Sequence, residues 1–119
     1  MIKLLKANDK IDHLKANNNG FTPLMYACQY GHFDVVKCLL EKATLDYVNQ
    51  QAHRGETALF MASCFNHYNI AKHLLQYGAN MNLKDIDGET PLGIAKEEEC
   101  DSSIINLLEL EMQRFEIMS

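Results

Sequence analysis

The sequence has no tryptophan, two prolines and no long run of apolar residues. A membrane-spanning helix needs about 20 such residues in succession, and the first residues also lack the apolar core of a secretory signal. We therefore expect a protein that spans no membrane and stays in the compartment where it is made. Its four cysteines are widely spaced without a CxxC pair, which favours a reducing compartment, the cytoplasm or alternatively the nucleus, over a disulfide framework.

Positive charge is scarce as well. Eleven lysines and arginines stand against 16 aspartates and glutamates, which leaves a formal net charge of −5. Ten of the acidic residues and two of the basic ones fall in residues 85–119, so the C-terminal third is the acidic end. The absence of a basic stripe with interleaved aromatic residues argues against nucleic acid as a partner. A chain of 119 residues can bury the core of a single domain, residues 1–119, without disulfides or metal.

One short pattern is present three times. The pattern is glycine, a variable residue, threonine, proline or alanine, and leucine. It begins at Gly20 and returns at Gly55 and Gly88, after steps of 35 and 33 residues. An alanine follows each copy at the same offset, and a pair of leucines comes later in each. Self-similarity at this period is typical of stacked repeats, in which each unit completes its core against its neighbours.

The residues of each copy predict two helices and a turn. Threonine followed by proline, as at Thr22 and Thr90, is a strong start signal for a first helix. Gly31 ends that helix near Tyr30, and Asn66 can do the same one copy later. Two adjacent pairs of apolar residues, one helical turn apart, then predict the second helix. These residues are Val35, Val36, Leu39 and Leu40 in the first copy and Ile70, Ala71, Leu74 and Leu75 in the second. Asparagine–glycine and aspartate–glycine pairs predict a hairpin loop between units.

These features resemble the ankyrin repeat, whose pattern is Gly-x-Thr-Pro-Leu-His-x-Ala-Ala, two variable residues, Gly-His, and then paired valines and leucines. The resemblance covers residues 17 to about 110 and implies an all-α solenoid of stacked helix-turn-helix units joined by β-hairpin loops. We assign residues 17–51 to repeat one, 52–84 to repeat two and 85–119 to repeat three, which includes an extended C-terminal capping helix. Residues 1–16 resemble a degenerate N-terminal half-repeat.

The sequence departs from the family pattern in three places. The family's histidine after Thr-Pro-Leu is replaced by Met25, Phe60 and Gly93, so the hydrogen bonds of that histidine must be absent or replaced, and we expect modest stability. The stretch from Leu40 to Gly55 is two residues longer than its counterpart in repeat two, which predicts a loop that bulges on the outer face. Apolar residues continue at helical spacing in the tail, which predicts a longer last helix that folds over the open end.

In the ankyrin family the concave face consists of the hairpin tips and the exposed side of each first helix, and it varies with the partner. The resemblance therefore implies a non-enzymatic protein-interaction module, an adaptor, inhibitor or regulatory subunit, that acts as a monomer on another protein. The candidate contact residues are Asn18, Asn19, Phe21, Gln29, Tyr30, His53, Arg54, Glu56, Cys64, Phe65, Ile86, Asp87, Glu89, Glu97 and Glu98.

Three aromatic residues stand out among these positions. Phe21, Tyr30 and Phe65 are expected to be exposed and to anchor a partner, because exposed aromatic residues are typical of interface hot spots. Alternatively, Tyr30 and Phe65 pack against each other along adjacent first helices and serve only the fold. The acidic residues of repeat three and Arg54 would suit a partner with an apolar centre, one basic end and an acidic group.

Two cysteine–histidine pairs raise the possibility of metal or thiol chemistry. Cys28 and His32, like Cys64 and His67, lie about one helical turn apart, but equivalent residues of neighbouring repeats are roughly 10 Å apart, too far for one tetrahedral zinc site. The second pair could activate a thiolate, although this spacing is more often simple packing. The acidic run at residues 97–101 lacks the glycine-containing loop of a calcium site, and no glycine-rich phosphate loop is present. We expect no metal, no cofactor and no catalysis.

The C-terminal tail offers an alternative function. Met112, Phe115 and Met118 could join the last helix to a second copy of the chain instead of capping its own repeat. The chain would then be a self-assembling scaffold, a homo-oligomer through its C-terminal helix.

Overall fold

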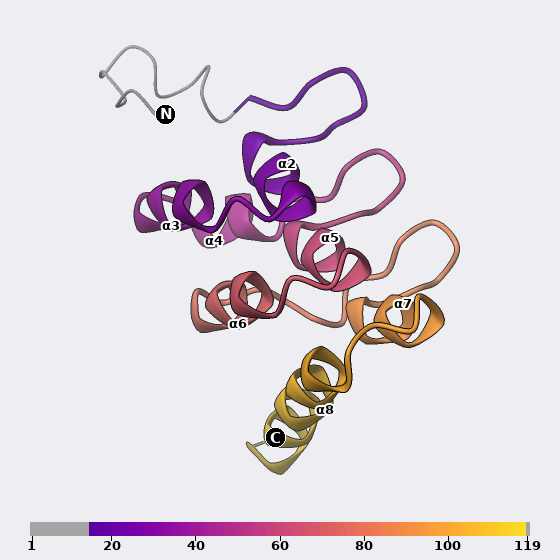
Figure 1. The fold of residues 1–119 in the computed structure, drawn as a ribbon. Helices are drawn as coiled ribbons and strands as arrows, with labels where there is room; N and C mark the ends of the chain where they lie inside the picture. Colours follow the sequence, from indigo (N-terminus) through magenta and orange to yellow (C-terminus); the bar gives the residue numbers. More distant parts are fainter. Residues whose placement is uncertain (1–14, 119) are drawn as a thin grey trace.

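The computed structural model describes the backbone of residues 15–118 and the side chains of residues 15–114. In that part of the chain the helices are α2 (Pro23–Tyr30), α3 (Phe33–Glu41), α4 (Leu45–Val48), α5 (Ala58–Cys64), α6 (Tyr68–Gln76), α7 (Pro91–Glu97) and α8 (Ser102–Met118). Figure 1 shows α2, α5 and α7 stacked as one layer, α3 and α6 as a second layer that α8 continues, and the loops between units projecting to one side. The fold is an all-α solenoid of stacked helix pairs, as the sequence predicts.

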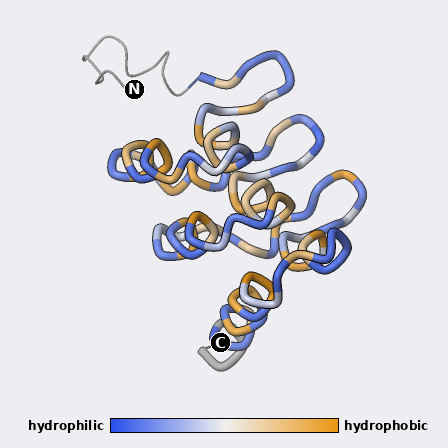
Figure 2. The backbone as a smooth tube through the Cα atoms, viewed as in Figure 1, coloured by the Kyte–Doolittle hydropathy of each residue, from blue (hydrophilic) through white to orange (hydrophobic). Residues whose placement is uncertain are grey.

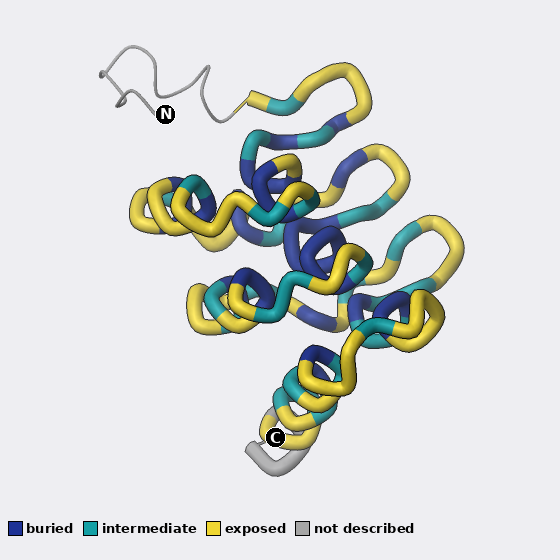
Figure 3. Tube along the Cα trace, viewed as in Figure 1, coloured by how far each residue is buried: buried dark blue, intermediate teal, exposed yellow. Residues whose placement is uncertain are grey.

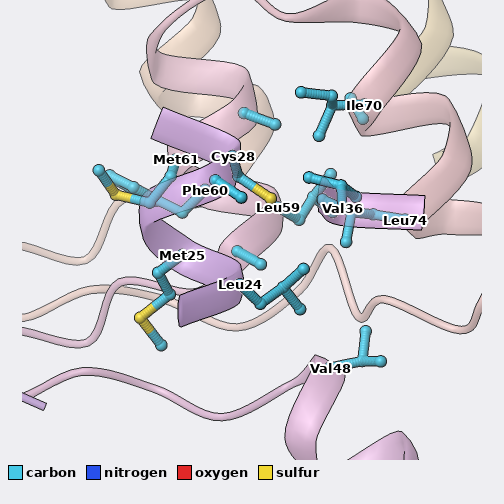
Figure 4. Close-up of a cluster of buried hydrophobic side chains, with 14 of the residues drawn as sticks. Leu24, Met25, Cys28, Val36, Val48, Leu59, Phe60, Met61, Ile70 and Leu74 are labelled. Atoms are coloured by element: carbon cyan, nitrogen blue, oxygen red, sulfur yellow. The ribbon is translucent and has the colours of Figure 1, made fainter. Parts of the chain in front are cut away.

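The hydrophobic core lies between the two layers. Leu24 and Leu59 of the first helices and Val36 and Leu74 of the second helices are all buried. Figure 4 shows these side chains in one cluster, and Figures 2 and 3 show that the apolar and buried stretches coincide on the helices, whereas the loop tips are mostly hydrophilic and exposed. Because α5 packs on α2 and on α7, the middle unit contributes to the core on both of its sides.

The first helix of every unit begins at the predicted threonine. The threonine Oγ1 accepts a hydrogen bond from the backbone N–H three residues later, and the pairs are Thr22 with Met25 at 3.2 Å, Thr57 with Phe60 at 3.0 Å and Thr90 with Gly93 at 3.1 Å. The helix ends are also as predicted in the first two units, where Gly31 and Asn66 adopt left-handed φ values of 74° and 63°. In the third unit Glu99 takes this conformation with φ 55°, which is unfavourable for a residue with a long side chain.

A backbone hydrogen bond joins the two ends of each hairpin loop, and further bonds join the loops into a ladder. The closing bonds run from Asn17 N–H to Phe21 O, from Ala52 N–H to Glu56 O and from Asp85 N–H to Glu89 O, at 2.9, 2.8 and 2.9 Å. Between units, His53 N–H donates to Asn19 O at 3.1 Å and Ile86 N–H donates to Arg54 O at 2.9 Å. The ladder fixes the spacing of the hairpin tips from one unit to the next.

The long stretch between Leu40 and Gly55 does not form the bulging loop that its length predicts. It contains α4, which begins at Thr44, whose Oγ1 accepts a hydrogen bond from Tyr47 N–H at 3.1 Å. Tyr47 and Val48 are buried, and the Tyr47 hydroxyl accepts a hydrogen bond from Leu24 N–H at 3.3 Å. Burial raises the pKa of Tyr47, so the hydroxyl remains neutral at physiological pH. The longer connection therefore adds apolar surface and a hydrogen bond to the core.

The last helix is longer than the others, as predicted. α8 packs on α6 and α7, with Ile104 and Leu108 fully buried and Met112 packed against the core. Most of the predicted half-repeat at residues 1–16, and the side chains of Phe115 and Met118, lie outside the described residues. None of the described helices is long and apolar enough to cross a membrane. The division of residues 1–119 into the repeats assigned above stays a prediction.

Candidate functional site

The fifteen candidate residues, here called the candidate surface, fall into two rows. The hairpin row consists of Asn18, Asn19, Phe21, His53, Arg54, Glu56, Ile86, Asp87 and Glu89, at the tips that the backbone ladder holds together. The helix-end row consists of Gln29, Tyr30, Cys64, Phe65, Glu97 and Glu98, at the C-terminal ends of α2, α5 and α7. Five of these residues are half-buried, namely Phe21, Gln29, Glu56, Cys64 and Glu89, and the other ten are exposed.

The three predicted aromatic anchors differ in exposure. Tyr30 is 62% exposed and Phe65 is 44% exposed, although Cys28 and Ser63, two residues before them, are fully buried. Phe21 is half-buried because its ring packs on Tyr26, with 5.2 Å between the ring centroids. Tyr30 has His32 as its ring neighbour at 6.3 Å, and no ring contact joins Tyr30 to Phe65 among the described residues. Two aromatic rings on neighbouring first helices are thus open to solvent.

The third unit makes one end of the candidate surface acidic. Asp87, Glu97 and Glu98 are exposed, and Ile86 at the hairpin tip is 63% exposed. Partial desolvation, followed by the carboxylates of Glu97, Asp85 and Asp87, raises the pKa of Glu89. In the described part of the chain, the ion pairs join Lys96 to Glu109 and Arg114 to Glu111, so the carboxylates of the candidate surface are not neutralised by a neighbouring cation.

Glu56 and Arg54 mark the middle of the hairpin row. Glu56 Oε1 is buried and has no hydrogen-bond partner within residues 15–114, which is costly for an acceptor unless a donor is supplied. Arg54 is exposed and forms no ion pair with a described residue. Of the two side chains, Arg54 is therefore the one that is open to a group of opposite charge.

Within the two cysteine–histidine pairs, Cys28 and His67 contribute to the fold. His67 Nε2 lies 3.0 Å from the carbonyl oxygen of Gln29 and links repeat two to repeat one, whereas neither His32 nor His67 caps the helix that follows it. Cys28 is fully buried, and burial raises its pKa far above the ordinary value for a thiol, so it remains protonated. No cluster of three or more potential metal ligands occurs among the described residues.

In repeat three Cys100 takes the place of the bridging histidine. Its Sγ donates a weak hydrogen bond to the carbonyl oxygen of Ser63 at 3.1 Å, in the preceding unit. The bridge between neighbouring units is thus kept with a shorter side chain.

A second aromatic group on the outer helices escapes the sequence prediction. Phe33 of α3 packs edge-on against His73 of α6 with 5.5 Å between ring centroids, and His73 packs on Tyr77 at 5.0 Å. Lys37 Nζ lies 5.9 Å from the centroid of the Phe33 ring. The spacing of His73 and Tyr77, one helical turn apart, is a signal that they share a face, but their contact with Phe33 depends on how the repeats stack.

A groove of about 610 Å³ lies apart from the candidate surface. It is lined by Leu45 and Asn49 at α4, by the stretch that follows α6, and by Glu111 and Arg114 of α8. None of the fifteen candidate residues lines it. The candidate residues thus take no part in this groove.

Comparison with known proteins links the chain to one family. The family model for ankyrin repeats (3 copies) matches residues 1–51 and 42–115. The chain is similar to Alpha-latroinsectotoxin-Lt1a of Latrodectus tredecimguttatus, with 35% identity over 79 residues that cover 66% of this chain and 6% of that protein. It is 30% identical to the probable E3 ubiquitin-protein ligase XBOS32 of Oryza sativa subsp. japonica over 93 residues, 77% of this chain and 18% of that protein.

A third relative shares a longer segment. Ankyrin repeat and SAM domain-containing protein 6 of Mus musculus is 33% identical over 104 residues, which cover 86% of this chain and 12% of that protein. The chain spans less than a fifth of the length of each of these three relatives. Their names differ, so what they share with this chain is the repeat and not one activity. The stacked helix pairs, the threonine caps and the matched family model establish that this chain belongs to the ankyrin-repeat family.

Proposed function

We propose that this chain binds another protein through the candidate surface and has no catalytic activity of its own. Ankyrin repeats are generally protein-interaction modules. The observation that carries the proposal is the exposure of Tyr30 and Phe65 at equivalent positions of neighbouring first helices. Aromatic residues that are open to solvent on a rigid support are typical hot spots of protein interfaces. The chain would act as an adaptor, an inhibitor or a regulatory subunit.

The charges suggest what the partner looks like. An apolar segment of the partner would lie on Tyr30 and Phe65, and basic side chains at one end would meet Asp87, Glu97 and Glu98. Arg54 would pair with an acidic group between these two regions. Because opposite charges across a rim mainly accelerate association, raising the salt concentration should weaken binding through this end.

The stacked scaffold supports binding by a few anchors. The hairpin tips are tied to each other by backbone hydrogen bonds, and α5 is packed on both sides, so few groups have to be ordered when a partner docks. A surface that loses little conformational freedom on association keeps more of the gain from each contact. The widely spaced cysteines make the cytoplasm the proposed compartment.

Alanine substitutions at the two aromatic anchors test this proposal. A partner is first captured from the source cells with the wild-type chain and identified by mass spectrometry, and its affinity is then measured by calorimetry. Tyr30→Ala and Phe65→Ala should each lower the affinity roughly 30-fold, which corresponds to a hot spot of about 2 kcal/mol. Their thermal unfolding, followed by circular dichroism, should be nearly unchanged because both side chains are exposed.

The matched control is Tyr77→Ala, since Tyr77 is 40% exposed but lies on the outer helices. This variant should bind like the wild type. Equal affinity of all three variants and the wild type would contradict the proposal that the candidate surface is the interface.

Self-association through α8 is the second candidate function. Leu110 is exposed on α8, beyond the fully buried Leu108, which supports a contact between this helix and a second copy. If the chain self-associates there, sedimentation velocity should detect a dimer at the concentrations used for the binding measurements. Leu110→Lys should then dissociate it without unfolding the chain. A wild-type chain that sediments as a monomer would remove this candidate.

A further inference from the structure

Two of the four thiols lie close together where repeat two meets repeat three. Cys64 is the last residue of α5, and Cys100 lies in the turn between α7 and α8. Cys100 Sγ is 3.9 Å from the carbonyl oxygen of Cys64. Since a carbonyl oxygen lies about 2.4 Å from the Cα of its own residue, Cys100 Sγ is within roughly 6.5 Å of the Cα that carries the Cys64 side chain.

We propose that Cys64 and Cys100 are a redox site that forms a reversible disulfide between repeats two and three. A disulfide requires Cα atoms about 4.4–6.8 Å apart. The contact brings the Cys100 sulfur to the backbone of Cys64. The bond forms when Cys100 rotates away from the Ser63 carbonyl oxygen, to which it now donates, and the turn that carries it moves until the two Cα atoms reach this separation. The proposal concerns the chemistry of these thiols and does not depend on the partner-binding function proposed above.

The co-reactant is a small disulfide such as oxidised glutathione. The thiolate of one cysteine attacks a glutathione sulfur, forms a mixed disulfide and releases one glutathione thiolate. The second cysteine, after losing its proton, attacks the protein sulfur of that mixed disulfide, forms the Cys64–Cys100 bond and releases a second glutathione thiolate. Two protein thiols lose two electrons and two protons, and one oxidised glutathione becomes two reduced molecules.

The other two cysteines do not share these conditions. Cys28 is fully buried in α2, so a small disulfide cannot reach it in the folded chain. Cys38 is exposed on α3 of repeat one and can react only to a mixed disulfide unless a second cysteine lies beside it. Cys64 and Cys100 are both half-buried, which leaves them accessible while their neighbours hold them in place.

The environment of the pair makes its oxidation slow near neutral pH. Burial, then Glu98 and then the other thiol raise the pKa of Cys64, and burial, Glu98 and Asp101 raise the pKa of Cys100. Because only the thiolate attacks a disulfide, a raised pKa leaves a small reactive fraction that grows about tenfold per pH unit. The bond would thus form under sustained oxidation and be reversed in a reducing compartment, where disulfides of folded proteins are transient.

Mass spectrometry of the full chain tests the proposal. Incubation of the wild type with oxidised glutathione should lower the intact mass by two hydrogen atoms, after allowance for any adduct on Cys38, and peptide mapping should join Cys64 to Cys100. The cross-link should form about ten times faster when the pH is raised by one unit, and dithiothreitol should remove it. The Cys38→Ser variant should still form the cross-link, whereas Cys64→Ser and Cys100→Ser should carry glutathione on the remaining thiol instead.

The outcome that would overturn the proposal does not depend on any variant. A folded wild-type chain that gains only glutathione adducts, or that forms a cross-link between other cysteines, would show that the pair is not a redox site. The thermal midpoint adds a second criterion. A bond that fits the native geometry should raise the midpoint by several degrees relative to the reduced chain. A lowered midpoint would show that the bond does not fit the native geometry and would equally overturn the proposal.

Discussion

Replacing Gly55 with alanine should destabilise the protein by about 3 kcal/mol, whereas the same replacement at Gly88 should cost about 1 kcal/mol. Both glycines end hairpin loops with left-handed backbone, at φ +89° and +83°, so a side chain is strained at either position. The two sites differ in their surroundings. A Cβ on Gly55 would lie 2.6 Å from the Cα of Asp85, whereas a Cβ on Gly88 meets no atom within 4 Å.

The difference between the two variants therefore measures the contact between neighbouring hairpins. Asp85 contributes backbone atoms, which cannot rotate away as a side chain can, so Gly55→Ala must push the hairpin of repeat three outward. That movement would break the hydrogen bond from Ile86 N–H to Arg54 O. Urea unfolding of both variants and the wild type, followed by circular dichroism, gives the two free energies. Equal destabilisation by the two substitutions would show that backbone strain, and not the packing of the hairpins, sets the cost.

The features that follow from local rules were predictable from the sequence. A threonine before proline starts α2 and α7 at Thr22 and Thr90, and the glycine at position 31 ends α2, because capping depends on residues that are neighbours in the chain. The stacking of the units was predictable as well, since the same apolar stripe returns with every repeat. These parts of the fold require no knowledge of contacts between distant residues.

The features that depend on contacts between units were not predictable in the same way. The two extra residues before Gly55 indicate only a longer connection, and nothing local shows that Tyr47 reaches Leu24 and turns this connection into α4. The approach of Cys100 to the end of α5 likewise depends on how repeat three sits on repeat two. Insertions and substitutions at such positions have to be judged from the assembled structure.

The candidate surface also combines features that the sequence predicts with features that depend on contacts between units. The repeat pattern predicts which positions lie on the hairpin tips and helix ends, but the degree of exposure depends on neighbours. Phe21 is half-buried because its ring packs on Tyr26, whereas Tyr30 is exposed to solvent. The outer aromatic group was missed because Phe33 and His73 meet only across two stacked units. Whether the candidate surface is the interface is decided by the binding measurements proposed above.

Replacing Leu59 with alanine should have the other large effect, a loss of about 3–4 kcal/mol in the free energy of unfolding. Leu59 is 1% exposed and lies in α5, which is packed between α2 and α7, so little backbone can move in to fill the cavity that the smaller side chain leaves. Domains of this size are stable by only about 5–15 kcal/mol, so the variant should unfold at a clearly lower urea concentration.

Leu110→Ala is the matched control for this loss, because it removes the same atoms from a side chain that is 60% exposed on α8. Its effect should stay within about 0.5 kcal/mol, since leucine and alanine are both good helix formers and no buried cavity is created. The shape of the unfolding curve carries a further test. Because the middle unit joins the outer two, Leu59→Ala should shift a single transition, whereas two separate transitions would mean that the units unfold independently and that α5 does not hold them together.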